Sequence, residues 1–336
     1  MFGHLCCAGS HDDSDRKVRD ARGGRGWRRH GAGAGTALAR AADAIAEATR
    51  LGRLLVGSIL LAAATSLPEL TVDAAGDLLG SSLMNLLILA GIDLAQRNGR
   101  RMLSREAASH ALSATLAIAL TAIAGTAILT AGKLPTLVVL GIGGWSWAML
   151  IAYLLGARML FIDQRISARL AAEEGPSPAG HLWKSAVAFG VAAAILVAAG
   201  PRLAATAAEL AERSGLGGTF VGTTLVAITT SLPELMASLA AVRLGAIDLA
   251  IGNAFGSNAF NMILFVPLDA AYPGNFFQAV SPAHAVTAFA VIVATAIAVL
   301  GQLYHVERRL PVVEPDALLM ILVICGALVL VFRLSS

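Results

Sequence analysis

Long hydrophobic runs separated by short polar segments dominate the chain. Runs with few or no charged residues cover positions 54–67, 111–131, 134–155, 185–199, 283–302 and 316–332. The hydrocarbon core of a bilayer is about 30 Å thick, and a helix of about 20 residues crosses it. The pattern therefore predicts membrane-spanning helices.

About nine membrane helices are predicted, four in the first half of the chain and five in the second. Their expected ranges are 54–75, 78–95, 110–131, 134–156, 184–203, 218–240, 248–269, 283–303 and 316–333. Hydrophobic residues make up 57% and charged residues only 14% of the chain, which is too apolar for a soluble domain of this length. We expect an all-α, polytopic transmembrane protein.

The two halves share sequence. TSLPEL occurs at residues 65–70 and again at 230–235, and at this shift of 165 twelve of the twenty positions in 51–70 are identical to 216–235. Downstream, GSSLMN at 80–85 matches GSNAFN at 256–261 at a shift of 176, so the first copy is 176 minus 165, or 11, residues shorter. Duplicated halves are common in transporters.

The repeat divides the chain into four parts. Residues 1–35 are polar and rich in Arg and Gly, and we expect them to be disordered. The first, shortened repeat covers 36–158, a cytoplasmic linker covers 159–183, and the second repeat covers 184–336.

Basic residues set the expected orientation. A cytoplasmic N-terminus places most loop Lys and Arg residues inside, among them Arg97, Arg100, Arg101, Arg105, Arg158, Arg165, Arg169, Lys184, Arg243, Arg308 and Arg309, as the positive-inside rule requires. The two TSLPEL spans then run in opposite directions and meet near the bilayer midplane. The net charge of +3 is small, so we expect lipid rather than nucleic acid beside the basic loops.

Each TSLPEL copy places a proline and a glutamate within the membrane. A proline inside a helix leaves the carbonyl four residues earlier without its partner, here at Ala64 and Thr229. A carboxylate at mid-membrane is costly unless it lines a wet cavity or meets a cation. Glu69 and Glu234 therefore predict a polar site.

The residues around these glutamates complete an oxygen-rich set. Thr65 and Glu69 are four residues apart and share a helix face, and the second motif repeats that spacing. The set comprises Thr65, Glu69, Ser81, Asn85, Thr230, Glu234, Ser257 and Asn261. Such oxygens suit hard cations such as Ca²⁺ or Na⁺. A single motif could instead be a helix kink or a packing contact, but the duplication favours a site.

Other chemistries find little support. The chain has no nucleotide-binding loop, nucleophile arrangement or zinc spacing, so we expect neither an enzyme nor a tightly bound cofactor. Cys6, Cys7 and Cys325 offer no metal spacing and no plausible disulfide. Asp73 lies one turn beyond Glu69, where a functional role and a tolerated interface position are both open.

Paired TSLPE motifs, each followed by GSS or GSN and then Asn, resemble the sodium/calcium exchanger (cation/calcium antiporter) superfamily in its prokaryotic form. The resemblance implies an inverted-repeat exchanger fold of five plus five helices in the cell membrane, exporting Ca²⁺ against Na⁺ or H⁺. It carries the ion ligands over to Thr65, Ser66, Glu69, Ser81, Asn85, Thr230, Ser231, Glu234, Ser257 and Asn261. A calcium/proton antiporter, or a degenerate relative that keeps the fold without transporting, are the alternatives.

Three features depart from the family pattern. Both final motif positions, Asn85 and Asn261, are amides, although some members have an acidic residue at one of them. The segment before Leu38 is too polar to span a bilayer, so the family's first helix is expected to be missing. The shortened first repeat is expected to turn at Gly76 and Asp77 within the membrane.

Overall fold

The computed structural model describes residues 33–71, 74–95, 107–134, 137–171, 182–213, 229–303 and 315–335. Most of the predicted N-terminal segment, and Asp73, lie outside these ranges. The predicted all-α class is confirmed, because every secondary-structure element of the described residues is a helix apart from one small hairpin.

Residues 33–49 form the first described helix, followed by the first-repeat elements α2 (Arg53–Leu55), η1 (Val56–Leu61), α3 (Ala62–Ser66), η2 (Leu67–Thr71), α4 (Ala74–Ala95), α5 (Ala107–Thr130), β1 (Val138–Val139), β2 (Ile142–Gly143) and α6 (Gly144–Ala171). The second repeat contains α7 (Leu182–Arg213), α9 (Leu232–Arg243), α10 (Ile247–Ile263), α11 (Phe265–Ala271), α12 (Phe276–Ala279), α13 (Ala283–Leu303) and α14 (Pro315–Ser335).

Within the described residues, five helices are long and apolar enough to cross a membrane: 110–130, 144–166, 182–202, 247–271 and 283–303. Shorter apolar helices cover 78–94 and 315–331. The first TSLPEL segment is divided into α2, η1, α3 and η2, so length and composition alone do not identify it as a span. The predicted span 218–240, which carries the second copy, lies partly outside the described residues.

A helix at residues 33–49 precedes the first TSLPEL segment, in contrast to the expectation that the first repeat lacks its opening helix. Its apolar residues Ala34, Leu38 and Ala42 are buried in the core, and Gly35 packs against Met236 of α9. Arg40, Asp43 and Glu47 break the apolar run, so the hydrophobic pattern did not reveal a span. At a shift of 165 this helix corresponds to the second half of α7.

The span predicted at 134–156 begins later, at Gly144. Residues 138–143 instead form a hairpin in which Val138 pairs with Gly143, and the turn residues Leu140 and Gly141 both have positive φ angles, 55° and 80°. Two positive φ angles give the turn that suits a two-residue hairpin. An apolar run alone does not distinguish such a hairpin from a helix.

The turn predicted at Gly76 and Asp77 is wrong, because both residues lie inside α4. Gly76 serves close packing instead, since a methyl group there would lie 2.8 Å from a carbon of the His284 ring in α13. Helix α4 begins before both of them, at Ala74.

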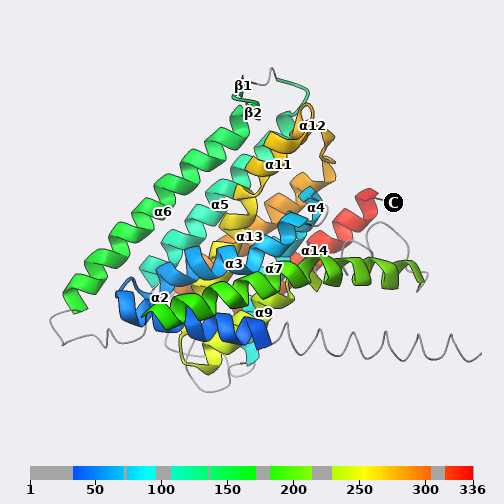
Figure 1. Cartoon of the computed structure of the whole chain (residues 1–336). Coiled ribbons are helices and arrows are strands. Elements are labelled where there is room, and N and C mark those ends of the chain that lie inside the picture. The colour runs from blue at the N-terminus through cyan, green and yellow to red at the C-terminus, as the bar shows by residue number, and fades with distance from the viewer. Residues whose placement is uncertain are drawn as a thin grey trace, which may run out of the picture.

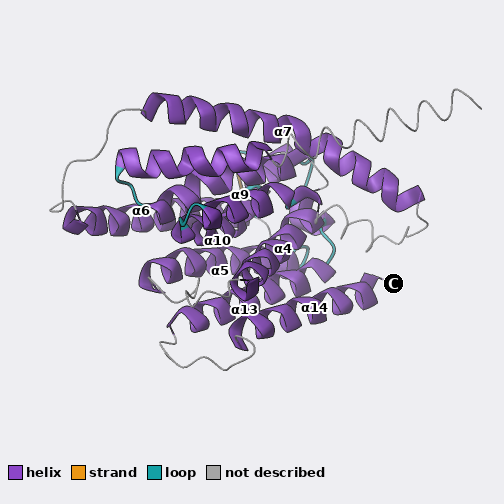
Figure 2. Ribbon diagram, turned by 90° about the horizontal axis from the view of Figure 1, so that it is seen from below, coloured by secondary structure: helices purple, strands orange, loops and turns teal. Residues whose placement is uncertain are grey.

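Helix α10 lies at the centre of the molecule. It contacts η1, α3, α4, α5 and α9. In the candidate span 247–271, which comprises α10 and α11, 83% of the most apolar stretch is buried. In Figure 1 the helix 33–49 and α7 cross the lower part of the molecule, while α5 and α6 run steeply upward. Figure 2 shows α7 along one edge and α14 along the opposite edge, with α9, α10 and α4 between them.

Glycines let α10 touch the backbone of the first repeat. A methyl group on Gly252 would lie 2.6 Å from the carbonyl oxygen of Leu54, and one on Gly57 would lie 2.6 Å from that of Leu249. Gly256 is packed still more tightly against the backbone of Ser58. Small residues at helix crossings allow this approach in membranes.

We predict that Gly256→Ala destabilises the protein, because the added methyl group meets backbone that cannot rotate away. Overpacking of this kind costs ~1–3 kcal/mol or more. Gly190→Ala in α7 is the matched control, since nothing lies within 4 Å of its methyl position. Size-exclusion chromatography after heating in detergent measures the effect, and equal melting temperatures for the two variants would contradict the crossing described here.

Candidate cation-binding site

The predicted site residues come from four interrupted or central helices. Thr65 and Ser66 end α3, Glu69 lies in η2, and Ser81 and Asn85 follow on α4. From the second repeat come Thr230 and Ser231 just before α9, Glu234 in its first turn, and Ser257 and Asn261 on α10. All of these side chains are buried, none more than 3% exposed.

Pro233 marks a point where a helix restarts, which differs from its predicted interior position, whereas the chain stays helical through Pro68. Pro233 lies in the first turn of α9, directly after the turn at Ser231. Pro68 lies in the short 3₁₀ segment that follows α3. A proline is well placed in a first helical turn, because the N–H that it lacks has no partner within the helix there.

Glu69 is held by the second motif of its own repeat. The Ser81 hydroxyl donates a hydrogen bond to Glu69 Oε1. Ser81 Oγ also lies 3.1 Å from Ser231 Oγ and 3.5 Å from Asn261 Nδ2, both from the second repeat. Ser81 thus connects the two halves at the first carboxylate.

Glu234 contacts the first repeat. The Ser66 hydroxyl donates to Glu234 Oε1 at 3.4 Å. Glu234 also lies in the first turn of α9, where the helix dipole stabilises a negative charge.

The remaining hydroxyls bridge the repeats in the same way. Thr65 Oγ1 lies 3.4 Å from Ser257 Oγ and 3.3 Å from Asn253 Oδ1, both on α10. The motifs that are far apart in sequence therefore form one hydrogen-bonded cluster.

The two amides at the final motif positions have a common feature. Asn85 Nδ2 donates to Asn258 Oδ1 at 3.1 Å, and Asn261 Nδ2 donates to the Leu78 carbonyl at 3.4 Å. Their carbonyl oxygens, Asn85 Oδ1 and Asn261 Oδ1, are buried, and neither has a hydrogen-bond partner in the structure. A buried acceptor without a partner costs ~1–3 kcal/mol.

The structure adds residues that sequence reasoning missed. Asn253 and Asn258 of α10 are fully buried and bond to predicted site residues, and Ser238 of α9 accepts from Asn253 Nδ2 at 3.1 Å. The run GNAFGSNAFN carries these asparagines in the sequence. Their first-repeat counterparts, at a shift of 176, are Asp77 and Ser82, so the comparison of the two copies did not point to them.

The donor atoms are carboxylate, hydroxyl and amide oxygens. Among the described residues, no group of three or more His, Cys, Asp or Glu side chains is arranged to hold a metal ion. An oxygen set that relies on hydroxyls and amides fits a hard cation such as Ca²⁺ or Na⁺ better than a transition metal.

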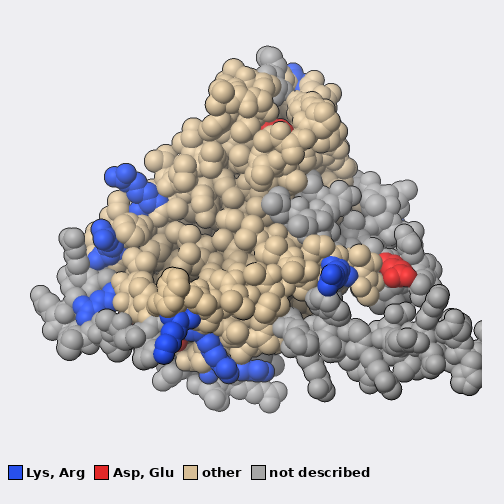
Figure 3. All heavy atoms as spheres, viewed as in Figure 1, with Lys and Arg blue, Asp and Glu red and all other residues tan. Residues whose placement is uncertain are grey.

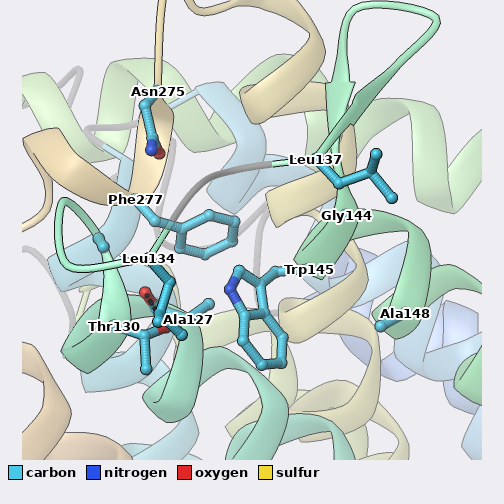
Figure 4. Close-up of a pocket in the computed structure, with 10 residues that line it drawn as sticks. Ala127, Thr130, Leu134, Leu137, Gly144, Trp145, Ala148, Asn275 and Phe277 are labelled. Carbon is cyan, nitrogen blue, oxygen red and sulfur yellow. Dashed lines mark hydrogen bonds between the residues drawn. The ribbon is translucent and has the colours of Figure 1, made fainter.

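Two cavities lie away from this cluster, at the hairpin end of the molecule. One of about 290 Å³ is lined by Trp145, Phe277 and Asn275 at the hairpin end of α6 (Figure 4). A neighbouring cavity of about 370 Å³ reaches Asp269, whose Oδ2 accepts from Gly143 N and Ser146 Oγ, both at 2.7 Å. Neither is lined by a predicted site residue. The carboxylate cluster is closed to solvent in this conformation, because Glu69 and Glu234 are each 1% exposed.

The chain is similar in sequence to a family of membrane transporters and to individual members of known sequence. The profile of the family described as "Sodium/calcium exchanger protein" matches residues 184–333. The putative antiporter CaxA of Alkalimonas amylolytica is 27% identical over 236 residues, which cover 66% of this chain and 71% of the relative. The inner membrane protein YrbG of Escherichia coli K12 is 29% identical over 261 residues, or 69% and 74% of the two chains.

The fold is also similar to that of solved structures. A structure of the sodium-calcium exchanger NCX_Mj superposes with a TM-score of 0.62 at 18% identity, covering 91% of this chain and 98% of that chain. The predicted polytopic, helical exchanger fold is thereby confirmed.

We predict that Ser81→Ala weakens Ca²⁺ binding roughly tenfold, because it removes a hydroxyl that bonds to Glu69 and to two second-repeat residues. Ser82→Ala is the matched control. Its hydroxyl donates only along its own helix, to the Leu78 carbonyl at 2.8 Å, and we expect less than about a twofold change. Isothermal titration calorimetry in detergent measures both, and equal losses would show that Ser81 has no special role.

Proposed function

We propose that the chain is a cation antiporter of the sodium/calcium exchanger superfamily, and that it exports Ca²⁺ in exchange for Na⁺ at the site between Glu69 and Glu234. It is a multi-pass membrane transporter rather than an enzyme. The transported ions are its substrates, and the proposal needs no resident cofactor.

The unpartnered amide oxygens of Asn85 and Asn261 carry this proposal. Together with Glu69 and Glu234 they supply carboxylate and carbonyl oxygens from both repeats. Ca²⁺ takes six to eight such ligands. A cation bound among them would compensate the buried acceptors and the two costly carboxylates together.

Coupling follows from competition for the same atoms. One Ca²⁺ neutralises two carboxylates, and monovalent cations can do the same, but the two kinds of ion need the same oxygens. A site that returns across the membrane only when loaded exchanges one kind for the other. Protons on the glutamates would serve equally in a calcium/proton antiporter, so the coupling ion is decided by experiment.

We further propose that the N-terminus is cytoplasmic. Arg158 and Arg165 lie toward the carboxyl end of α6, Lys184 at the start of α7 and Arg243 at the end of α9. These helix ends lie in the lower part of Figure 1, and Figure 3 shows Lys and Arg gathered along the lower left of the same view. The positive-inside rule assigns that end to the cytoplasm.

Purified protein in liposomes tests the coupling. We expect radioactive calcium to enter Na⁺-loaded liposomes faster than K⁺-loaded ones at equal pH. Uptake driven only by an acidic interior would identify a proton antiporter instead. Correctly folded protein that gives no uptake under either gradient would be a relative that has lost transport.

We predict that Glu234→Gln abolishes Na⁺-driven uptake and weakens Ca²⁺ binding by more than about tenfold, because an amide cannot offset a divalent charge. Glu69→Gln should behave in the same way. Glu209→Gln, on the exposed surface of α7, makes the same chemical change outside the site and should leave uptake unaltered. Wild-type calcium affinity in Glu234→Gln would disprove the assignment.

A further inference from the structure

Helix α10 contributes an asparagine, Asn258, that contacts the predicted ligand Asn85 without being a predicted ligand itself. Asn258 is fully buried and belongs to neither the predicted ligands nor their repeat partners. Its two amide atoms both bond to α4 of the first repeat, in a fixed direction.

A backbone carbonyl fixes the orientation of the Asn258 amide. Asn258 Nδ2 donates to the carbonyl oxygen of Ser82 at 3.2 Å, and a carbonyl can only accept. This contact decides which end of the Asn258 amide faces Ser82. The oxygen, Asn258 Oδ1, must therefore face the other way.

Asn258 Oδ1 in turn accepts from Asn85 Nδ2 at 3.1 Å. An amide that donates on one side presents its oxygen on the other. Asn85 Oδ1 is the buried oxygen without a partner. Reversing Asn85 would face two N–H groups toward a bound cation and would oppose two oxygens at Asn258.

We propose that Asn258 is a positioning residue that fixes Asn85 with its oxygen toward the transported cation. The inference rests on the proposed function, because it takes Asn85 to be a cation ligand. The Ser82 carbonyl fixes the orientation of the Asn258 amide, and the Asn258 amide fixes that of Asn85. We call these three groups the relay.

Only the first-repeat ligand, Asn85, is oriented by a second amide; its repeat partner Asn261 is not. Asn261, the repeat partner of Asn85, donates to the Leu78 carbonyl and to Ser81 Oγ, with no second amide between. At a shift of 176 the counterpart of Asn258 is Ser82 itself, the residue that it contacts. The orientation of the first-repeat ligand therefore depends on a side chain from the second repeat.

A double-mutant cycle tests the relay through calcium affinity measured by calorimetry. We expect Asn258→Leu to weaken Ca²⁺ binding roughly tenfold in the wild-type background, but less than about twofold when Asn85 is already replaced in Asn85→Ala. A purely structural role would lower affinity by the same factor in both backgrounds. Additivity in that sense overturns the proposal.

Asn253→Leu is the matched control, since Asn253 is another fully buried α10 asparagine whose bonds go to Thr65 and Ser238 rather than to Asn85. Its effect should be the same with and without Asn85→Ala. Coupling as strong as that of Asn258 would overturn the specific relay. If Asn258→Leu does not fold, Asn258→Ser, too short to reach both partners, takes its place with the same expectations.

The two proposals fail in different ways. Wild-type protein that binds neither Ca²⁺ nor Na⁺ would overturn both, because Asn85 would have no cation to face. Wild-type protein that binds Ca²⁺ but shows additive losses for Asn258→Leu and Asn85→Ala would overturn only the positioning role.

Discussion

The close crossing of α10 and the first-repeat helix is the constraint on which the rest of the structure depends. Gly57, Gly252 and Gly256 let the two backbones touch, and this contact brings the polar side of α10 against the TSLPEL residues. Asn253, Ser257 and Asn261 follow at intervals of four residues and so lie on one helix face. A wider crossing would separate Ser257 from Thr65 and leave polar groups without partners in an apolar interior.

The polar cluster is costly, and its arrangement reflects how that cost is reduced. Hydroxyls from each repeat reach the carboxylate region of the other, as Ser66 does for Glu234 and Ser231 does through Ser81. Neither half of the site is complete alone. In a buried network each polar group that finds a partner lowers the cost of the others, which ties the stability of the fold to the geometry of the site.

Much of this could be predicted from the sequence. The repeated motifs located Glu69, Glu234 and their neighbours because duplication is visible in the letters themselves. The helix at 33–49 escaped because Arg40, Asp43 and Glu47 interrupt its apolar run, and the hairpin at 138–143 escaped because apolar strands and helices look alike over short stretches. Asn258 could not be found by comparing the repeats, because its partner is a serine and its role depends on a contact between helices.

The burial of the candidate site limits how fast an ion there could be exchanged. With Glu69 and Glu234 each 1% exposed, an ion at this position could neither leave nor be replaced while the helices keep this arrangement. In the proposed exchange cycle every exchange event would therefore wait for a collective helix movement, which takes microseconds to milliseconds or longer. Turnover in that cycle would be set by how often the protein opens, and raising the ion concentration beyond saturation would not make it faster.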